Sequence, residues 1–198
     1  MTNPLLAPWT GPYGLPPFAD VRAEHFAPAF AEAMRDHLAE IDAIGVASAA
    51  PTFANTVAAF DRAGRVLERV GALFHNLASS ETSPALQAVE REMAPLLAAH
   101  DSTVYTHAAL FARIDSLHDR RERIGLDAEQ QRVLERFHLD FVRAGAKLAP
   151  AEQTRHAAVM QRLAELTTRF GQNVLADESE FLLVLKDEAD LAGLPPFV

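Results

Sequence analysis

The fold class is indicated most clearly by residues 26–44, which read FAPAFAEAMRDHLAEIDAI. Large apolar side chains recur in this stretch at intervals of three and four residues. They are Phe26, Phe30, Met34, Leu38, Ile41 and Ile44. This spacing forms one apolar stripe on an amphipathic helix. Pro28 fits in the first turn of that helix, where the missing N–H costs no hydrogen bond.

The same periodicity continues after this first helix. We expect a second helix to begin at Thr52, a good N-cap, and to run to about Leu77. Gly64 and Gly71 lie on or beside its apolar stripe. Because glycine inside a helix costs roughly 1 kcal/mol relative to alanine, the two glycines suggest close approach by another helix.

Four more helices are indicated by start signals and by apolar spacing. One begins at Ser83-Pro84, and a shorter one ends near Gly125. Residues 127–130 form a capping box with Asp127 as the N-cap, and the last long helix begins near Pro150. About six helices in succession predict an all-α fold, an antiparallel bundle of long helices.

The two ends of the chain differ from this pattern. Residues 1–20 are rich in proline and glycine, so we expect an extended arm that packs its aromatic side chains onto a helical domain at 21–198. Residues 181–185 read FLLVL and predict one short strand. A single strand forms no sheet, so its partner would be a cryptic strand, another molecule or absent chain. The ending PPFV looks like a cut through a longer protein.

Composition narrows the class of protein. The chain has 198 residues, 49% hydrophobic and 23% charged, which suits one folded domain or a large piece of a bigger protein. It has no cysteine, which excludes disulfides, thiolate metal sites and cysteine nucleophiles. The net charge of −9 argues against nucleic acid as a partner. Because we find neither a secretory signal nor a membrane-length apolar run, we expect a cytoplasmic protein without a membrane partner.

A metal site is difficult to build from the histidines. None of the eight is followed by glutamate, and no two lie four residues apart, so HExxH and a helical zinc pair are both absent. A carboxylate-bridged two-metal bundle needs two Glu-x-x-His motifs. The sequence offers Glu135–His138, while Asp115–His118 has the wrong acid, so we favour a half-buried, hydrogen-bonded His138 over a metal ligand.

The sequence gives equally weak evidence for other kinds of catalytic or binding site. His37 with Glu40 and His118 with Glu122 lie one turn apart and could exchange a proton, although such pairs are common on solvated helix faces. Residues 120–123 form a basic run that suits the end of a helix better than an anion site. Phosphate-binding loops and a serine nucleophile elbow are missing. We therefore assign no catalytic, cofactor-binding or metal residue to this chain.

Several local phrases occur in the order found in a known family. They are NPLL (3–6), LPPF (15–18), HFAPAF (25–30), PTFANT (51–56), LFAR (110–113), GLDAE (125–129), FVRAGAKL (141–148), NVL (173–175) and DLAGLP (190–195). Together they resemble the N-terminal region of the M3 family of zinc metallopeptidases, the group of peptidyl-dipeptidase (dipeptidyl carboxypeptidase) and oligopeptidase A. LFAR and AGAKL look closer to the peptidyl-dipeptidase branch.

This resemblance implies a mostly helical, elongated hydrolase with a deep channel between two halves. The N-terminal helical region would form one channel wall and restrict access to short peptides. The zinc would be held by an HExxH helix and a later glutamate in the C-terminal half, none of which matches a position here. The implied partners are oligopeptide substrates and the C-terminal catalytic domain of the same chain. The alternative is a free-standing helical protein-interaction module.

Overall fold

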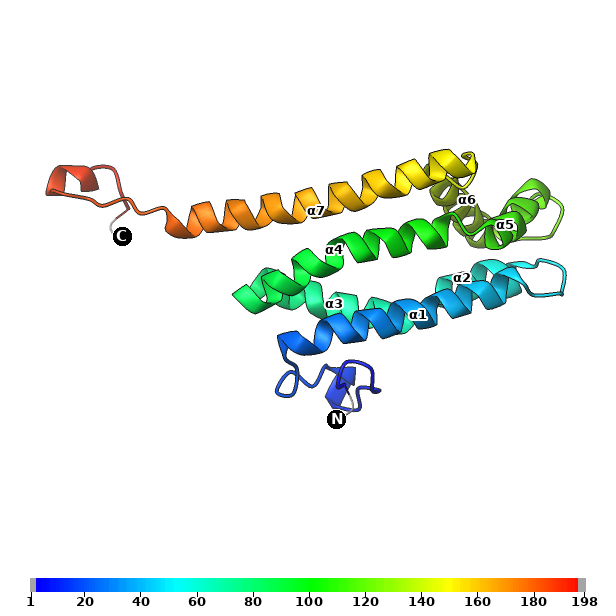
Figure 1. Ribbon diagram of the computed structural model, residues 1–198, viewed down its shortest axis with the longest axis horizontal. Coiled ribbons are helices and arrows are strands. Elements are labelled where there is room, and N and C mark those ends of the chain that lie inside the picture. The colour runs from blue at the N-terminus through cyan, green and yellow to red at the C-terminus, as the bar shows by residue number, and fades with distance from the viewer. Residues whose placement is uncertain (1–2, 196–198) are drawn as a thin grey trace.

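The computed structural model describes residues 3–195 and shows an elongated array of helices (Figure 1). The long helices α1 (Phe26–Gly45), α3 (Arg65–Ser80), α4 (Pro84–Tyr105) and α7 (Pro150–Glu180) run in alternating directions along one axis. Helices α2 (Ala58–Arg62), α5 (Ala108–Arg120) and α6 (Ala128–Arg143) gather at one end. Short turns of helix occupy Pro12–Gly14, Ala23–His25, Phe53–Val57 and Glu188–Leu191. The predicted all-α bundle is confirmed.

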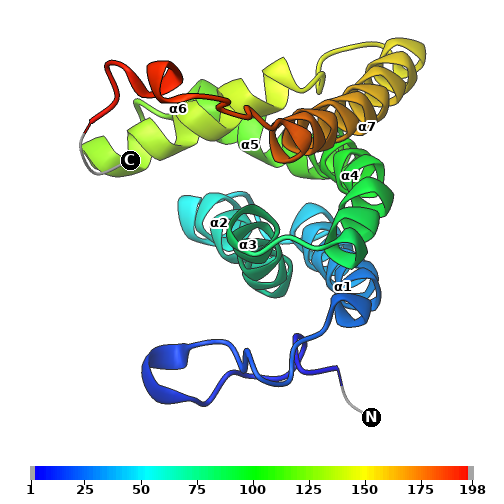
Figure 2. The same cartoon turned by 90° about the vertical axis from the view of Figure 1, so that its left-hand side faces the viewer.

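The long helices are arranged as a curved layer with α3 on its inner side. In the view along the long axis, α1, α4 and α7 follow one another in a row, and α3 lies beside α1 (Figure 2). Helices α5 and α6 pack on each other, and α5 also contacts α1. None of the helices within residues 3–195 combines the length and the apolar character needed to cross a membrane.

The interior consists of two apolar clusters, one toward each end of the array. In the first, the ring of Phe74 on α3 packs edge-on against Phe26 and Phe30 on α1, with centroid distances of 5.0 and 5.5 Å. The second joins α1, α4, α5 and α6. Its buried members are Ile41, Val57, Val104, Leu110, Ile114, Leu117, Leu134 and Phe141. Most of these residues belong to the apolar stripes that the helical periodicity predicts.

The N-terminal arm is held to α3 by an arginine. The Arg69 guanidinium donates to the backbone carbonyls of Leu5, Leu6 and Ala7 and lies 4.8 Å from the centre of the Trp9 ring. Leu5 is fully buried. The expected packing of the arm's aromatic residues is therefore correct for Trp9.

Two other aromatic residues of the arm do not pack as expected. Tyr13 is fully exposed, and half of Phe18 is exposed. Tyr13 lies in the isolated turn Pro12–Gly14, and Phe18 follows this turn.

The predicted second helix is interrupted. Thr52 caps it as expected, but the backbone turns at Gly64, whose φ of +73° lies in the left-handed region, and α3 begins at Arg65. A Cβ at Gly64 would lie 3.0 Å from the ring of His37, so the predicted close approach is correct there. A Cβ at Gly71 would lie 4.0 Å from the nearest atoms, an ordinary contact distance, so the packing at this position does not require glycine.

The predicted strand at residues 181–185 is wrong. The segment follows the last turn of α7 without forming a strand, and all five side chains are exposed. Local β-propensity is satisfied only when a neighbouring strand accepts and donates the backbone hydrogen bonds. Between residues 3 and 195 the structure contains no such neighbour.

Candidate functional site

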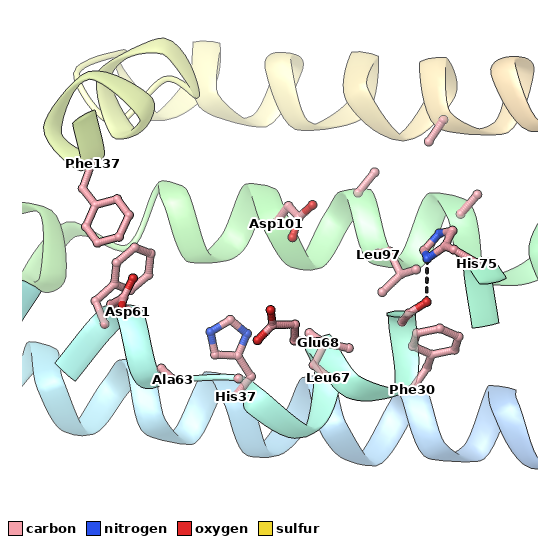
Figure 3. Close-up of a pocket in the computed structure, with 16 residues that line it drawn as sticks. Phe30, His37, Asp61, Ala63, Leu67, Glu68, His75, Leu97, Asp101 and Phe137 are labelled. Carbon is pink, nitrogen blue, oxygen red and sulfur yellow. Dashed lines mark hydrogen bonds between the residues drawn. The ribbon is translucent and has the colours of Figure 1, made fainter. Parts of the chain in front are cut away.

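A groove of about 680 Å³ opens along the middle of the array (Figure 3). All the helices except α5 contribute to its walls. Its apolar surface comes mainly from three aromatic rings and two leucines, namely Phe30, Phe60, Leu67, Leu97 and Phe137. A groove of this size and lining is typical of a binding surface.

Acidic side chains give the groove its charge. Asp61, Glu68 and Asp101 line it from α2, α3 and α4. Burial raises the pKa of the Asp101 carboxyl. No lysine or arginine is among the described residues that line the groove. The groove therefore favours cationic or neutral groups over phosphates.

Two histidines from different helices meet at the wall of this groove. The Nδ1 of His37 on α1 lies 2.9 Å from the Nε2 of His100 on α4. Burial and then the neighbouring His37 lower the pKa of His100 to about 4. Burial also lowers the pKa of His37, and the nearby Glu40 carboxylate partly opposes this. Both rings are thus held neutral near pH 7.

His37 and Glu40, which lie one helical turn apart, bind different partners. While His37 bonds to His100, the Glu40 carboxylate accepts the backbone N–H of Gly64 at 2.7 Å. This bond fixes the left-handed turn between α2 and α3 against α1. The two residues thus have separate hydrogen-bond partners, and both take part in packing the groove wall.

A second polar cluster joins α5 to α6, outside the groove. The Nε2 of His138 lies 2.8 Å from the Asp115 carboxylate, which also contacts the Lys147 ammonium at 3.2 Å. His118 stacks on His138 with ring centres 3.8 Å apart. Burial, followed by the charge of His138, lowers the pKa of His118. The interpretation of His138 as a half-buried, hydrogen-bonded residue is confirmed.

This cluster contains three of the four residues weighed for a two-metal site. Asp115, His118 and His138 come together, but Glu135 instead contacts the guanidinium groups of Arg121 at 3.6 Å and Arg132 at 3.7 Å. Within residues 3–195, no group of three or more histidine, aspartate or glutamate side chains has an arrangement that could hold a metal ion.

The basic run at residues 120–123 acts at a helix end. Arg120 lies in the last turn of α5 and donates to the carbonyl of Ser116 at 3.0 Å. Arg121 donates to the carbonyl of His118 at 2.9 Å. These contacts place positive charge at the C-terminal end of α5, where the helix dipole favours it, as expected from the sequence.

Arg113 is a buried structural residue that the sequence analysis did not single out. Its guanidinium donates to the carbonyls of Ala47 and Ala49 and to the side chains of Asn55 and Thr56. These bonds attach the connection between α1 and α2 to α5. The sequence motif LFAR includes this position, but the motif indicated only a family resemblance and gave no physical role for the arginine.

His100 is the partner of the groove residue His37 that sequence reasoning missed. It falls in the apolar stripe of α4, and 63 residues separate it from His37. A polar residue at a core-facing position was the available signal, because such a group needs a hydrogen-bond partner.

Comparison with known proteins identifies relatives along the whole chain. No model of a protein family matches it. Dipeptidyl carboxypeptidase from Escherichia coli is 38% identical over 192 residues, which cover 97% of this chain and 28% of the relative. The Salmonella typhimurium dipeptidyl carboxypeptidase is 37% identical, and oligopeptidase A from that organism is 30% identical over 195 residues. The chain is homologous to the N-terminal region of M3-family peptidases. It spans less than a third of the length of these M3 relatives.

Proposed function

We propose that this chain is the N-terminal, non-catalytic domain of a zinc-dependent peptidyl-dipeptidase or oligopeptidase that hydrolyses short peptides. The carrying observation is the 38% identity to E. coli dipeptidyl carboxypeptidase over 97% of this chain but only 28% of the relative. The lower identity to oligopeptidase A, 30%, favours the peptidyl-dipeptidase branch. The proposal places the enzyme in the cytoplasm.

The proposed role of the domain is to form one wall of the substrate channel. Its shape supports this role, because α1, α4 and α7 form a long curved layer (Figure 2). This layer is connected to the flanking segments by the two apolar clusters and by the hydrogen bonds of Arg113 and Arg69. A wall that restricts access must keep its shape, and such long-range contacts provide the necessary rigidity.

The zinc of the proposed enzyme does not fit the residues of this chain. His37 faces His100, and His118 stacks on His138 beside Asp115, but among the described residues no such group has an arrangement that could hold the ion. We therefore assign no residue of this chain to the metal. The proposed partners are oligopeptide substrates and the catalytic portion of the same polypeptide.

A chimera tests the proposal. In E. coli dipeptidyl carboxypeptidase, the region that matches this chain is replaced by this chain, and release of dipeptides from a blocked peptide is measured with and without a metal chelator. We expect chelator-sensitive activity in the chimera and none in the isolated chain. The control is the relative with the same region deleted, which we expect to be inactive.

Two results would contradict the proposal. One is a chimera that folds, as judged by circular dichroism, but releases no dipeptide. This result would favour the free-standing interaction module. The other is chelator-sensitive release of dipeptides by the isolated chain, which would show a catalytic site within it.

A further inference from the structure

Helix α7 has its apolar side chains on the side that faces away from the bundle. Toward α4 it presents half-buried residues that are small or polar, including Ala157, Ala164, Thr168 and Gln172. Gln172 donates to the carbonyl of Gln87 at 3.0 Å and to the Glu90 carboxylate at 2.7 Å. Of the 31 residues of α7, all of which are described, none is fully buried.

The opposite side of α7 carries an apolar stripe. Its members are Val159, Leu163, Leu166, Phe170 and Val174, with exposed fractions of 55%, 53%, 45%, 70% and 40%. Intervals of four, three, four and four residues place them on one line along the helix. A surface helix normally shows the reverse polarity, so the stripe is a surface built for contact.

The stripe continues beyond the helix. The side chains of residues 181–185 are all strongly exposed, and Phe181 directly follows α7. Most of the exposed large apolar side chains of the described chain lie at or after Val159. The contact surface therefore extends along α7 into the C-terminal segment that leaves the bundle (Figure 1).

The size of this surface indicates what covers it. A stable interface between separate proteins involves roughly 20–30 residues on each side, several times the number in the stripe. A smaller surface is sufficient when the partner is tethered, because the effective concentration is then on the order of millimolar. Two copies of this chain, each with a net charge of −9, would also repel each other.

The relatives are much longer than this chain, and their additional length indicates what the tethered partner is. The chain spans 28% of E. coli dipeptidyl carboxypeptidase and matches the N-terminal region of this peptidase group, so most of the relative's length follows the matched part. We propose that the apolar stripe of α7 is the surface on which the catalytic portion of the same polypeptide docks. This inference rests on the proposed function, and it assigns the contact to five named residues.

The test compares two double variants in two proteins. The variant Leu163→Gln/Phe170→Gln removes the centre of the stripe and keeps a good helix former at Leu163. The matched control, Leu96→Gln/Leu139→Gln, changes two exposed leucines on α4 and α6, with exposed fractions of 48% and 40%. Each is made in the isolated chain and in the chimera described above. The measurements are Tm, amide hydrogen exchange along α7 and sedimentation.

We expect the stripe variant to lower the Tm of the chimera by several degrees and to leave the isolated chain nearly unchanged. The control variant should leave both proteins nearly unchanged. Amides of α7 should exchange more slowly in the chimera than in the isolated chain. The single change Leu163→Gln should give a smaller shift of the same sign.

Two outcomes would overturn the docking proposal. In the first, the stripe variant leaves the Tm of the chimera unchanged and α7 exchanges equally fast in both proteins. In the second, the isolated wild-type chain sediments as a dimer and the stripe variant as a monomer, which would make a second copy the occupant. Activity is read separately. An inactive chimera with a protected α7 refutes the proposed function alone, and an active chimera with an unprotected α7 refutes the docking alone.

Discussion

His37 and His100 hold α1 against α4 through a hydrogen bond between two ring nitrogens. Their facing nitrogens, Nδ1 and Nε2, lie 2.9 Å apart, so one must carry hydrogen and the other must not. If both imidazoles were protonated, two N–H groups would point at each other. The intact pair therefore excludes the doubly charged state.

The first prediction is that the domain loses stability as the pH falls. Burial lowers the pKa of His100 from 6.5 to about 4, so between these values the unfolded chain binds more protons than the folded chain. The free energy of unfolding therefore decreases as pH falls through this window, by up to roughly 3 kcal/mol for His100. Asp101, whose pKa is raised by burial, acts in the opposite direction. Denaturant unfolding at pH 7.5 and at pH 4.5 measures the net effect.

The variant His100→Gln separates the histidine from the other groups. It should be less stable than wild type at pH 7.5, and the difference should shrink at pH 4.5, where the wild type has lost the contribution of neutral His100. The control His75→Gln changes an exposed histidine that bonds within its own helix. A stability difference between His100→Gln and wild type that is equal at both pH values would disprove this assignment.

The second prediction concerns two glycines with nearly the same backbone. Gly64 and Gly125 have φ of +73° and +68°, but only at Gly64 would a Cβ meet other atoms, the ring of His37 at 3.0 Å. Gly125→Ala should cost about 1 kcal/mol from backbone strain. Gly64→Ala should cost at least about 2 kcal/mol, because it adds crowding to the same strain. Equal losses in chemical denaturation would show that His37 moves aside freely.

The elements that could be predicted from sequence are those with local causes. The box at Asp127 and Gln130 and the cap at Ser83 lie within four residues of the backbone groups they satisfy, and both helices begin where expected. The interruption at Gly64 has a distant cause, because Glu40 and His37 of α1 fix the left-handed turn. Residues 181–185 fail as a strand for a related reason, since a strand needs a neighbour that local propensity cannot supply.

The candidate site was less accessible to sequence reasoning than the fold. His37 and His118 were noticed because of acidic residues one turn away, yet their main partners are His100 and His138 on other helices. These partners become neighbours only through helix packing, which one sequence does not specify. The groove likewise takes its lining from six helices, so no local motif marks it.

The third prediction tests the capping box of α6. Asp127 accepts the backbone N–H of Gln130 at 2.8 Å, whereas the return bond from the Asp127 N–H to the Gln130 side chain is longer, at 3.3 Å. Asp127→Ala should lower the free energy of unfolding by about 1 kcal/mol, and Gln130→Ala should lower it by less. Thermal or denaturant unfolding of both variants decides the order. The reverse order would mean that the side chain of Gln130 contributes more than the cap.

The last prediction concerns Arg113, which is 8% exposed and donates to two carbonyls and two side chains of the connection between α1 and α2. Arg113→Met removes every donor and deprives the carbonyls of Ala47 and Ala49 of the guanidinium, so it should cost on the order of 3 kcal/mol. Arg113→Lys keeps the charge but cannot reproduce the planar fork, and it should recover only part of the loss. Hydrogen exchange should rise first in residues 46–57, which lose their attachment to α5, before α5 itself opens.

The control Arg143→Met changes an exposed arginine at the end of α6 and should stay within about 0.5 kcal/mol of wild type. If Arg113→Lys were as stable as wild type, the charge alone would hold the connection, and the fork geometry would be irrelevant.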